Sequence, residues 1–154
     1  MKKDLINAIE KAMAQEGLCR TEERLADIIY DRGINEDSLS IILSKGDEVL
    51  FSTSSGQIKR QLNIPECRSM ADFLPTLTIT AKSLAMELTR HNVLKKDLSG
   101  EEKITEEHID NNTAVRKILL DRGINPETLP PAEDIAQVKK RISREDKNTL
   151  EIKE

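Results

Sequence analysis

Aromatic side chains are scarce in this chain: Tyr30, Phe51 and Phe73 are the only ones among 154 residues, and tryptophan is absent. A β-sandwich would carry aromatic and β-branched runs, so a core of Leu, Ile, Val, Met and Ala favours packed helices. The same scarcity argues against an aromatic platform on which the bases of single-stranded nucleic acid stack.

Long apolar runs, paired cysteines and an excess of positive charge are missing as well. No apolar stretch approaches the roughly 20 residues of a membrane span, and the charged N-terminus does not read as a secretory signal. Cys19 and Cys67 lie far apart, which favours two reduced thiols. The formal net charge of −4 means that the chain as a whole is not built to bind polyanions. We therefore expect a cytoplasmic protein with no membrane partner.

Motifs for catalysis and metal binding are also lacking. There is no nucleophile elbow, Gly-rich phosphate loop or Walker-type sequence. The histidines His91 and His108 and the two cysteines have spacings that fit no compact zinc motif. His91 follows Glu87 by four residues, the spacing of a surface pair on a helix. The sequence thus predicts a protein without metal or cofactor that is not an enzyme.

Helical periodicity is clearest between residues 104 and 131. Thr105 is a suitable N-cap, with Ile104 and Ile109 at the spacing of a hydrophobic staple. An apolar stripe of Val115, Ile118 and Leu119 follows at helical spacing. Gly123 can then adopt the left-handed conformation that ends a helix, with Pro126 beyond it. This segment predicts a helix from Thr105 to just before Gly123.

Similar patterns along the rest of the chain predict further helices. The expected ranges are 2–15 with a stop at Gly17, then about 21–32, 36–45 with a stop at Gly46, a turn at 47–51, 57–62 capped by Ser54, a turn at 69–73, 75–95 with an apolar stripe that includes Leu77 and Leu84, and 132–145. No β-hairpin or βαβ rhythm interrupts them. The predicted fold is an all-α compact bundle of about six to eight helices, several of them short. We expect one domain over residues 1–144 and a charged, frayed tail over 145–154.

A five-residue sequence occurs twice, as Asp-Arg-Gly-Ile-Asn at 31–35 and again at 121–125. The apolar residues before each copy also match at the same offset. An internal duplication explains this pattern, and so does a helix-ending sequence that is used twice.

The densest basic cluster consists of Lys139, Lys140, Arg141 and Arg144 on the last predicted helix. These side chains are candidates for contact with nucleic-acid phosphates. Acidic residues bracket them at Glu133, Asp134, Glu145 and Asp146, which is equally typical of an ordinary solvated helix. The apolar seam Ile135, Val138 and Ile142 on the same helix is too short for a coiled coil and fits docking onto its own domain or onto a partner helix.

Several ordered blocks of sequence point to a family. They are Ser44-Lys45-Gly46-Asp47, Ala71-Asp72-Phe73-Leu74-Pro75-Thr76, Thr89-Arg90-His91-Asn92-Val93, Ile104-Thr105-Glu106-Glu107-His108-Ile109, Asn111-Asn112, Val115-Arg116 and Leu129-Pro130-Pro131-Ala132-Glu133-Asp134-Ile135. Together they resemble DNA-damage-inducible protein D, over about residues 25–144. Members of that family usually carry an N-terminal Bro-type domain, associated with DNA binding, which is not in this sequence. We therefore expect either a stand-alone version or the C-terminal part of a longer protein.

The resemblance implies a role in the bacterial DNA-damage (SOS) response, with the recombinase RecA and its filaments as the partner. The alternative is a regulator borne by a phage or mobile element that binds a host protein. Polar and aromatic residues inside the matching blocks are the candidates for partner binding: Phe73, His91, Asn92, His108, Asn111, Asn112 and Arg116. The competing interpretation is that the histidines and asparagines satisfy buried backbone where two central helices cross.

Overall fold

A computed structural model describes the backbone of residues 2–153 and the side chains of residues 2–148. Over this range the chain forms six α-helices and two 3₁₀-helices and no strand, which confirms the predicted all-α bundle. The elements are α1 (Lys2–Asp31), α2 (Glu36–Phe51), α3 (Ser55–Gln61), η1 (Met70–Phe73), α4 (Thr76–Lys95), α5 (Glu101–Asp121), η2 (Pro126–Thr128) and α6 (Ile135–Lys153).

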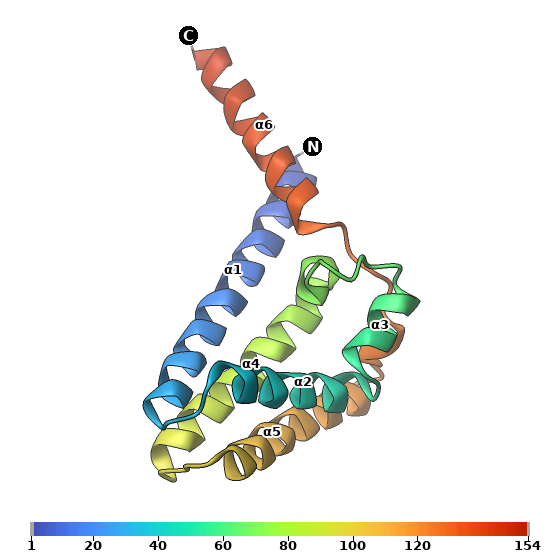
Figure 1. Ribbon diagram of the computed structural model, residues 1–154. Helices are drawn as coiled ribbons and strands as arrows, with labels where there is room; N and C mark the ends of the chain where they lie inside the picture. The colour runs from blue at the N-terminus through green and yellow to red at the C-terminus, as the bar shows by residue number, and fades with distance from the viewer. Residues whose placement is uncertain (1, 154) are drawn as a thin grey trace.

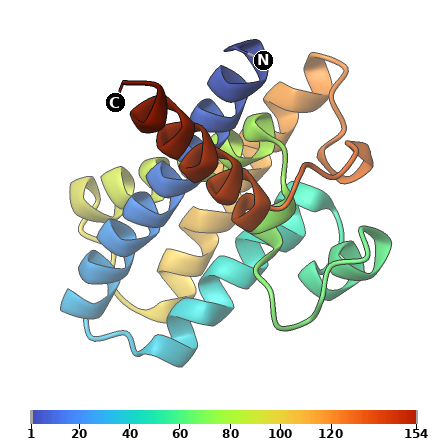
Figure 2. The same ribbon diagram turned by 90° about the horizontal axis from the view of Figure 1, so that it is seen from above.

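Four long helices make the body of the molecule. α1 packs along α4, α2 packs along α5, and α4 packs against α5 (Figures 1 and 2). The main core lies between these helices and includes Leu25, Ile42, Ile79 and Ile104, none of which is exposed to solvent. α6 crosses the N-terminal part of α1 and extends away from the body (Figure 1).

The predicted break at Gly17 is wrong, because α1 runs without interruption from Lys2 to Asp31. Nothing lies close to Gly17 that a side chain would meet. A glycine inside a helix costs only about 1 kcal/mol relative to alanine. Burial of Leu18 and Leu25 on the same helix outweighs that cost, so the helix continues.

The predicted break at Gly46 is also wrong. α2 passes through Gly46 and ends at Phe51, where Ser52 takes a left-handed conformation with φ of 56°. Gly46 is buried in the middle of this helix. The glycine therefore marks a close approach by a neighbouring element rather than a helix end.

α5 begins one turn earlier than the sequence predicted. Gly100, with φ of 89°, precedes the helix, and Glu101 is its first residue. Thr105 is not the N-cap, because its hydroxyl donates to the carbonyl oxygen of Glu101 at 2.6 Å inside the helix. Ile104 lies inside the helix rather than before it, and its side chain is fully buried in the core.

The two copies of the repeated sequence end α1 and α5 in the same way. Gly33 and Gly123 have φ of 80° and 76°. The amide of Ile34 donates to the carbonyl of Ile29, and that of Ile124 to the carbonyl of Leu119, as in a Schellman cap. α2 follows the first cap, whereas η2 follows the second. The helix-ending role is confirmed, and both explanations of the repeat remain open.

α6 packs on α1 through its apolar seam. Ile135 and Val138 are buried against Ala8, with Ile142 and Ala12 beside them, as a small core separate from the main one. The predicted seam thus docks onto the chain itself. The helix begins at Ile135 and its backbone continues to Lys153, through most of the expected charged tail, whose fraying stays a prediction. Glu154 lies outside the described residues.

Candidate functional site

A buried polar cluster occupies the crossing of α4 and α5. The Thr89 hydroxyl lies 2.7 Å from His108 Nδ1, and Asn111 Nδ2 donates to the same hydroxyl at 3.0 Å. The Thr89 hydroxyl in turn donates to the carbonyl of Ala85 at 2.9 Å. Asn112 Nδ2 lies 3.3 Å from His108 Nε2 and donates to the His108 carbonyl at 2.9 Å. These side chains therefore satisfy one another inside the molecule.

The contacts assign one tautomer to His108. Because the single hydrogen of the Thr89 hydroxyl is donated to the carbonyl of Ala85, the hydroxyl accepts a hydrogen bond from His108 Nδ1–H. His108 Nε2 is then free of a proton and accepts from Asn112. Burial lowers the pKa of His108 from 6.5 to about 4, with Lys82 nearby acting in the same direction and Asp47 against it. His108 is thus a neutral structural residue at neutral pH.

Gly46 of α2 packs directly against this cluster, in addition to α4 and α5. An ideal Cβ on Gly46 would lie 2.8 Å from Asn112 Nδ2 and closer still to the His108 imidazole. Beside it, Lys82 of α4 and Asp47 of α2 form an ion pair of 2.9 Å. Three helices therefore meet around groups that bond to each other.

Three of the candidate binding residues, His108, Asn111 and Asn112, belong to this cluster. His108 and Asn112 are each 2 % exposed. A partner would reach these side chains only if α4 and α5 moved apart. The arrangement gives them the structural duty that the competing interpretation assigned to them.

Arg116 and Phe73 hold connecting segments in place. Arg116 makes a two-bond pair with Glu127 of η2, at 2.7 and 2.8 Å, and also donates to the carbonyl of Leu50 at 2.8 Å. The carbonyl of Phe73 accepts from the amide of Ala132 at 2.8 Å. The Arg68 guanidinium lies over the Phe73 ring, 5.1 Å from its centre.

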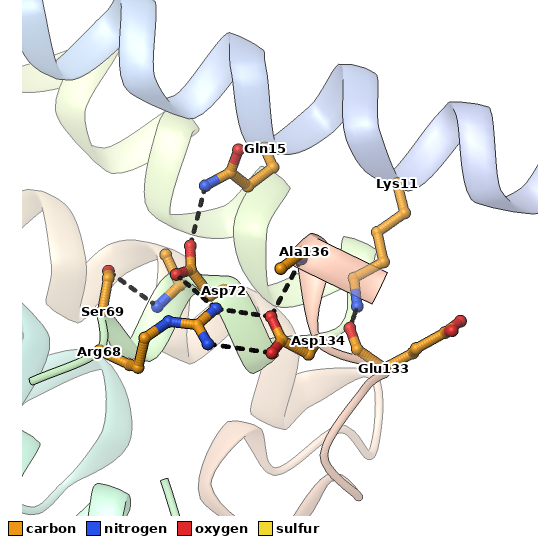
Figure 3. A network of polar contacts seen from close by, with 9 residues as sticks. Lys11, Gln15, Arg68, Ser69, Asp72, Glu133, Asp134 and Ala136 are labelled. Atoms are coloured by element: carbon orange, nitrogen blue, oxygen red, sulfur yellow. Dashed lines mark hydrogen bonds and ion pairs between the residues drawn. The ribbon is translucent and has the colours of Figure 1, made fainter. Parts of the chain in front are cut away.

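Arg68 is the centre of a network that fixes the start of α6 (Figure 3). Its guanidinium donates to both carboxylate oxygens of Asp134, at 2.6 and 3.0 Å, and to Asp72 at 3.2 Å. Asp134 also accepts from the amide of Ala136 at 3.0 Å in the first turn of α6. These hydrogen bonds from Arg68 and Ala136 lower the pKa of Asp134. Lys11 of α1 donates to the carbonyl of Glu133 in the same network.

His91 and Asn92, the remaining candidates, lie near the end of α4. The His91 side chain is exposed, and that of Asn92 is half-buried. The carbonyl of Asn92 accepts from the amide of Lys96 at 2.9 Å, which ends the helix. Of the seven candidates for partner binding, His91 alone has an exposed side chain.

An apolar hollow of about 140 Å³ opens on the surface between α4 and α5. Three large side chains line it and remain partly exposed: Leu77 at 45 %, Leu84 at 47 % and Ile118 at 59 %. Its remaining lining consists of Thr80, Ala81, Val115 and Leu119. Sequence periodicity placed Leu77, Leu84 and Ile118 in the apolar stripes of their helices, and the structure leaves these three side chains exposed at the hollow. Each apolar stripe extends beyond the part of the helix surface that the neighbouring helix covers. The width of the stripes was the only signal in the sequence for the hollow.

The basic residues of α6 divide into two groups. Arg141 is turned toward Glu133, at 2.9 Å, and its Nε is buried without a hydrogen-bond partner. Lys139, Lys140 and Arg144 instead line a shallow depression of about 350 Å³ together with Ser143 and Lys147. The structure thus brings together three of the four predicted basic residues and adds Lys147, which sequence inspection missed.

The described residues contain no group of three His, Cys, Asp or Glu side chains that could hold a metal ion. Cys19 and Cys67 are both free and exposed. No helix in the described part of the chain is long and apolar enough to cross a membrane. No protein-family model matches the chain, and no curated protein matches it.

Proposed function

We propose that this chain is a non-enzymatic binding protein that acts by contact with another protein, and that its partner is the RecA filament of the bacterial DNA-damage response. The observation that carries the binding role is the apolar hollow between α4 and α5. The resemblance to DNA-damage-inducible protein D is the support for the choice of partner.

The hollow has the composition of a protein contact rather than of a catalytic site. Single exposed apolar side chains are ordinary on protein surfaces, but Leu77, Leu84 and Ile118 gather around one depression. Its walls hold no titratable group. An apolar side chain of a partner would displace water from it and bury the three exposed side chains.

Two blocks of the resemblance border the hollow. The block that ends at Thr76 leads directly into Leu77, and Val115 lies in its wall. Polar residues of the other blocks, such as His108 and Asn111, bond to Thr89 and so fix α4 against α5, which holds the hollow in shape. The same blocks therefore contribute both to the buried contact between α4 and α5 and to the border of the hollow.

The test is binding of the full chain to RecA filaments on single-stranded DNA, with the naked DNA strand as the control. We expect binding to the filament that is weakened at least tenfold by Leu84→Asp or Ile118→Asp. Leu94→Asp is the matched control, because Leu94 is also an exposed leucine of α4 but lies outside the hollow.

If Leu84→Asp and Leu94→Asp reduced the affinity for the filament equally, the hollow would not be the binding surface. Absence of binding to the filament would reject RecA as the partner. The regulator of a phage or mobile element would then be the function to test, by capture of a host protein with the wild-type chain and with Ile118→Asp side by side.

A further inference from the structure

Positive charge is concentrated on one projecting helix of an otherwise acidic molecule. Residues 135–148 contain five Lys or Arg and two Asp or Glu, a formal charge of +3. The whole chain carries −4, so the other residues together carry −7. α6 extends from the body beside the N-terminal end of α1 (Figure 1), so its charge projects away from the body.

The exposed cations of α6 share one face. At about 3.6 residues per turn, Lys139, Lys140, Arg144 and Lys147 fall within a single arc of the helix. Ala136 and Ser143 are the other residues of that arc between residues 135 and 148. None of the four cations forms an ion pair with a described side chain, whereas Arg141 is taken by Glu133. Four cations are therefore available to an external anion.

We propose that this face of α6 binds the phosphate backbone of duplex DNA, without reading its sequence, through Lys139, Lys140, Arg144 and Lys147. The proposal goes beyond the protein contact proposed above and does not depend on it. The depression between these side chains, which Ser143 also lines, gives phosphate oxygens both positive charge and a hydroxyl donor.

Other polyanions fit this face less well. A basic amphipathic helix binds an anionic membrane by burying its apolar side, but Ile135 and Val138 are already buried against α1. Single-stranded nucleic acid is held by stacking on aromatic side chains, and residues 135–148 contain none. The major groove of duplex RNA is too deep and narrow for a helix to lie in it between the phosphates of the two strands. The major groove of B-form DNA, about 12 Å wide, admits a helix.

The experiment measures binding of the full chain to a fluorescent DNA duplex of unrelated sequence at several salt concentrations. Neutralising four phosphates predicts a slope of about −3 to −4 in log affinity against log salt. This corresponds to a loss of about 100-fold between 50 and 200 mM salt. The double variant Lys140→Gln, Lys147→Gln should reduce the slope to about −2 and weaken binding at low salt at least tenfold.

The matched control is the double variant Lys95→Gln, Lys103→Gln. It changes the net charge by the same amount. Both lysines are exposed, at the end of α4 and in the first turn of α5, and these helix ends lie at the opposite end of the molecule from α6 (Figure 1). We expect it to bind duplex DNA within twofold of the wild type. Equal losses in the two variants would overturn the proposal, since they would show a dependence on net charge alone.

Two further outcomes also overturn it. One is no binding of the duplex at 50 mM salt, and the other is tighter binding of vesicles containing phosphatidylserine than of the duplex. Filament binding separates this inference from the proposed function. Lys140→Gln, Lys147→Gln should lose duplex DNA and keep the filament, whereas Ile118→Asp should lose the filament and keep duplex DNA.

Discussion

His108 shows how a residue chosen as a binding candidate becomes a structural one. Its type and its place in a matching block suggested contact with a partner. The structure instead surrounds it with Thr89, Asn112 and Gly46, each on a different turn or helix. Asn112 lies one turn away on the same helix, and the sequence already offered a structural duty as the competing interpretation. Sequence inspection could not supply Thr89 of α4 and Gly46 of α2 as neighbours, because only folding brings these two residues to His108.

The buried imidazole predicts a pH dependence of stability. Burial lowers the pKa of His108 in the folded protein from 6.5 to about 4, so between those values the unfolded chain binds a proton that the folded chain does not. The free energy of unfolding should therefore fall by about 3 kcal/mol as the pH drops from 6.5 to 4. Urea unfolding at several pH values measures this loss.

His108→Gln should flatten the pH dependence over that window, whatever the variant costs in stability at neutral pH. His91→Gln, which changes the exposed histidine, should keep the wild-type curve. An unchanged curve for His108→Gln would show that other groups cause the loss. Glu127 and Asp134, whose carboxyl pKa values are lowered by hydrogen bonds from Arg116 and Arg68, act in the more acidic range.

At the scale of helices, the two internal glycines predict opposite effects of the same substitution. Gly17→Ala should raise the free energy of unfolding by about 0.5–1 kcal/mol, because alanine favours the helix and nothing lies near the new methyl group. Gly46→Ala should lower it by about 1–3 kcal/mol, because the methyl group meets His108 and Asn112. Thermal and urea unfolding measure both.

The pair of variants also tests why α2 passes through Gly46. If Gly46→Ala were as stable as Gly17→Ala, the close packing of α2 on α5 at this point would be incorrect. His108→Ala provides a second check, since removing the imidazole should make Gly46→Ala less costly in the double variant than in the wild type.

Helix ends divide into those that local sequence sets and those that packing sets. The caps at Gly33 and Gly123 and the Ser54 hydroxyl that accepts from the amide of Gln57 follow from neighbouring residues, and all were predicted correctly. Gly17, Gly46 and Thr105 have equally plausible local signals, yet no helix ends or begins there. At these positions burial of distant residues outweighs a preference worth about 1 kcal/mol.

At the scale of the whole molecule, two separate cores predict that α6 can detach without unfolding the body. Val138 is buried in the small core between α1 and α6, whereas Ile79 is fully buried in the main core. Val138→Asp should raise hydrogen exchange in residues 135–148 and 2–12 and leave the free energy of unfolding of the body within about 1 kcal/mol of the wild type. Hydrogen exchange with mass spectrometry measures this.

Ile79→Ala is the comparison variant and should lower the free energy of global unfolding by about 2–5 kcal/mol. If Val138→Asp destabilised the whole molecule as much as Ile79→Ala, α6 would be part of one cooperative unit with the body. The network of Arg68 and Asp134 would then transmit the loss, and exchange would rise throughout the chain.

The sequence by itself determined that the described chain is helical, where two of its long helices end, and that α6 carries an apolar seam and a basic cluster. These features depend on periodicity and on neighbours within a few residues, which a linear reading contains. Tertiary structure alone decided that His108 and Asn112 face inward, that Leu84 and Ile118 stay exposed around one hollow, and that Arg141 leaves the basic face while Lys147 joins it. Those outcomes depend on which side of each helix the neighbouring helices cover. The sequence of one segment does not determine where helices from distant segments will pack.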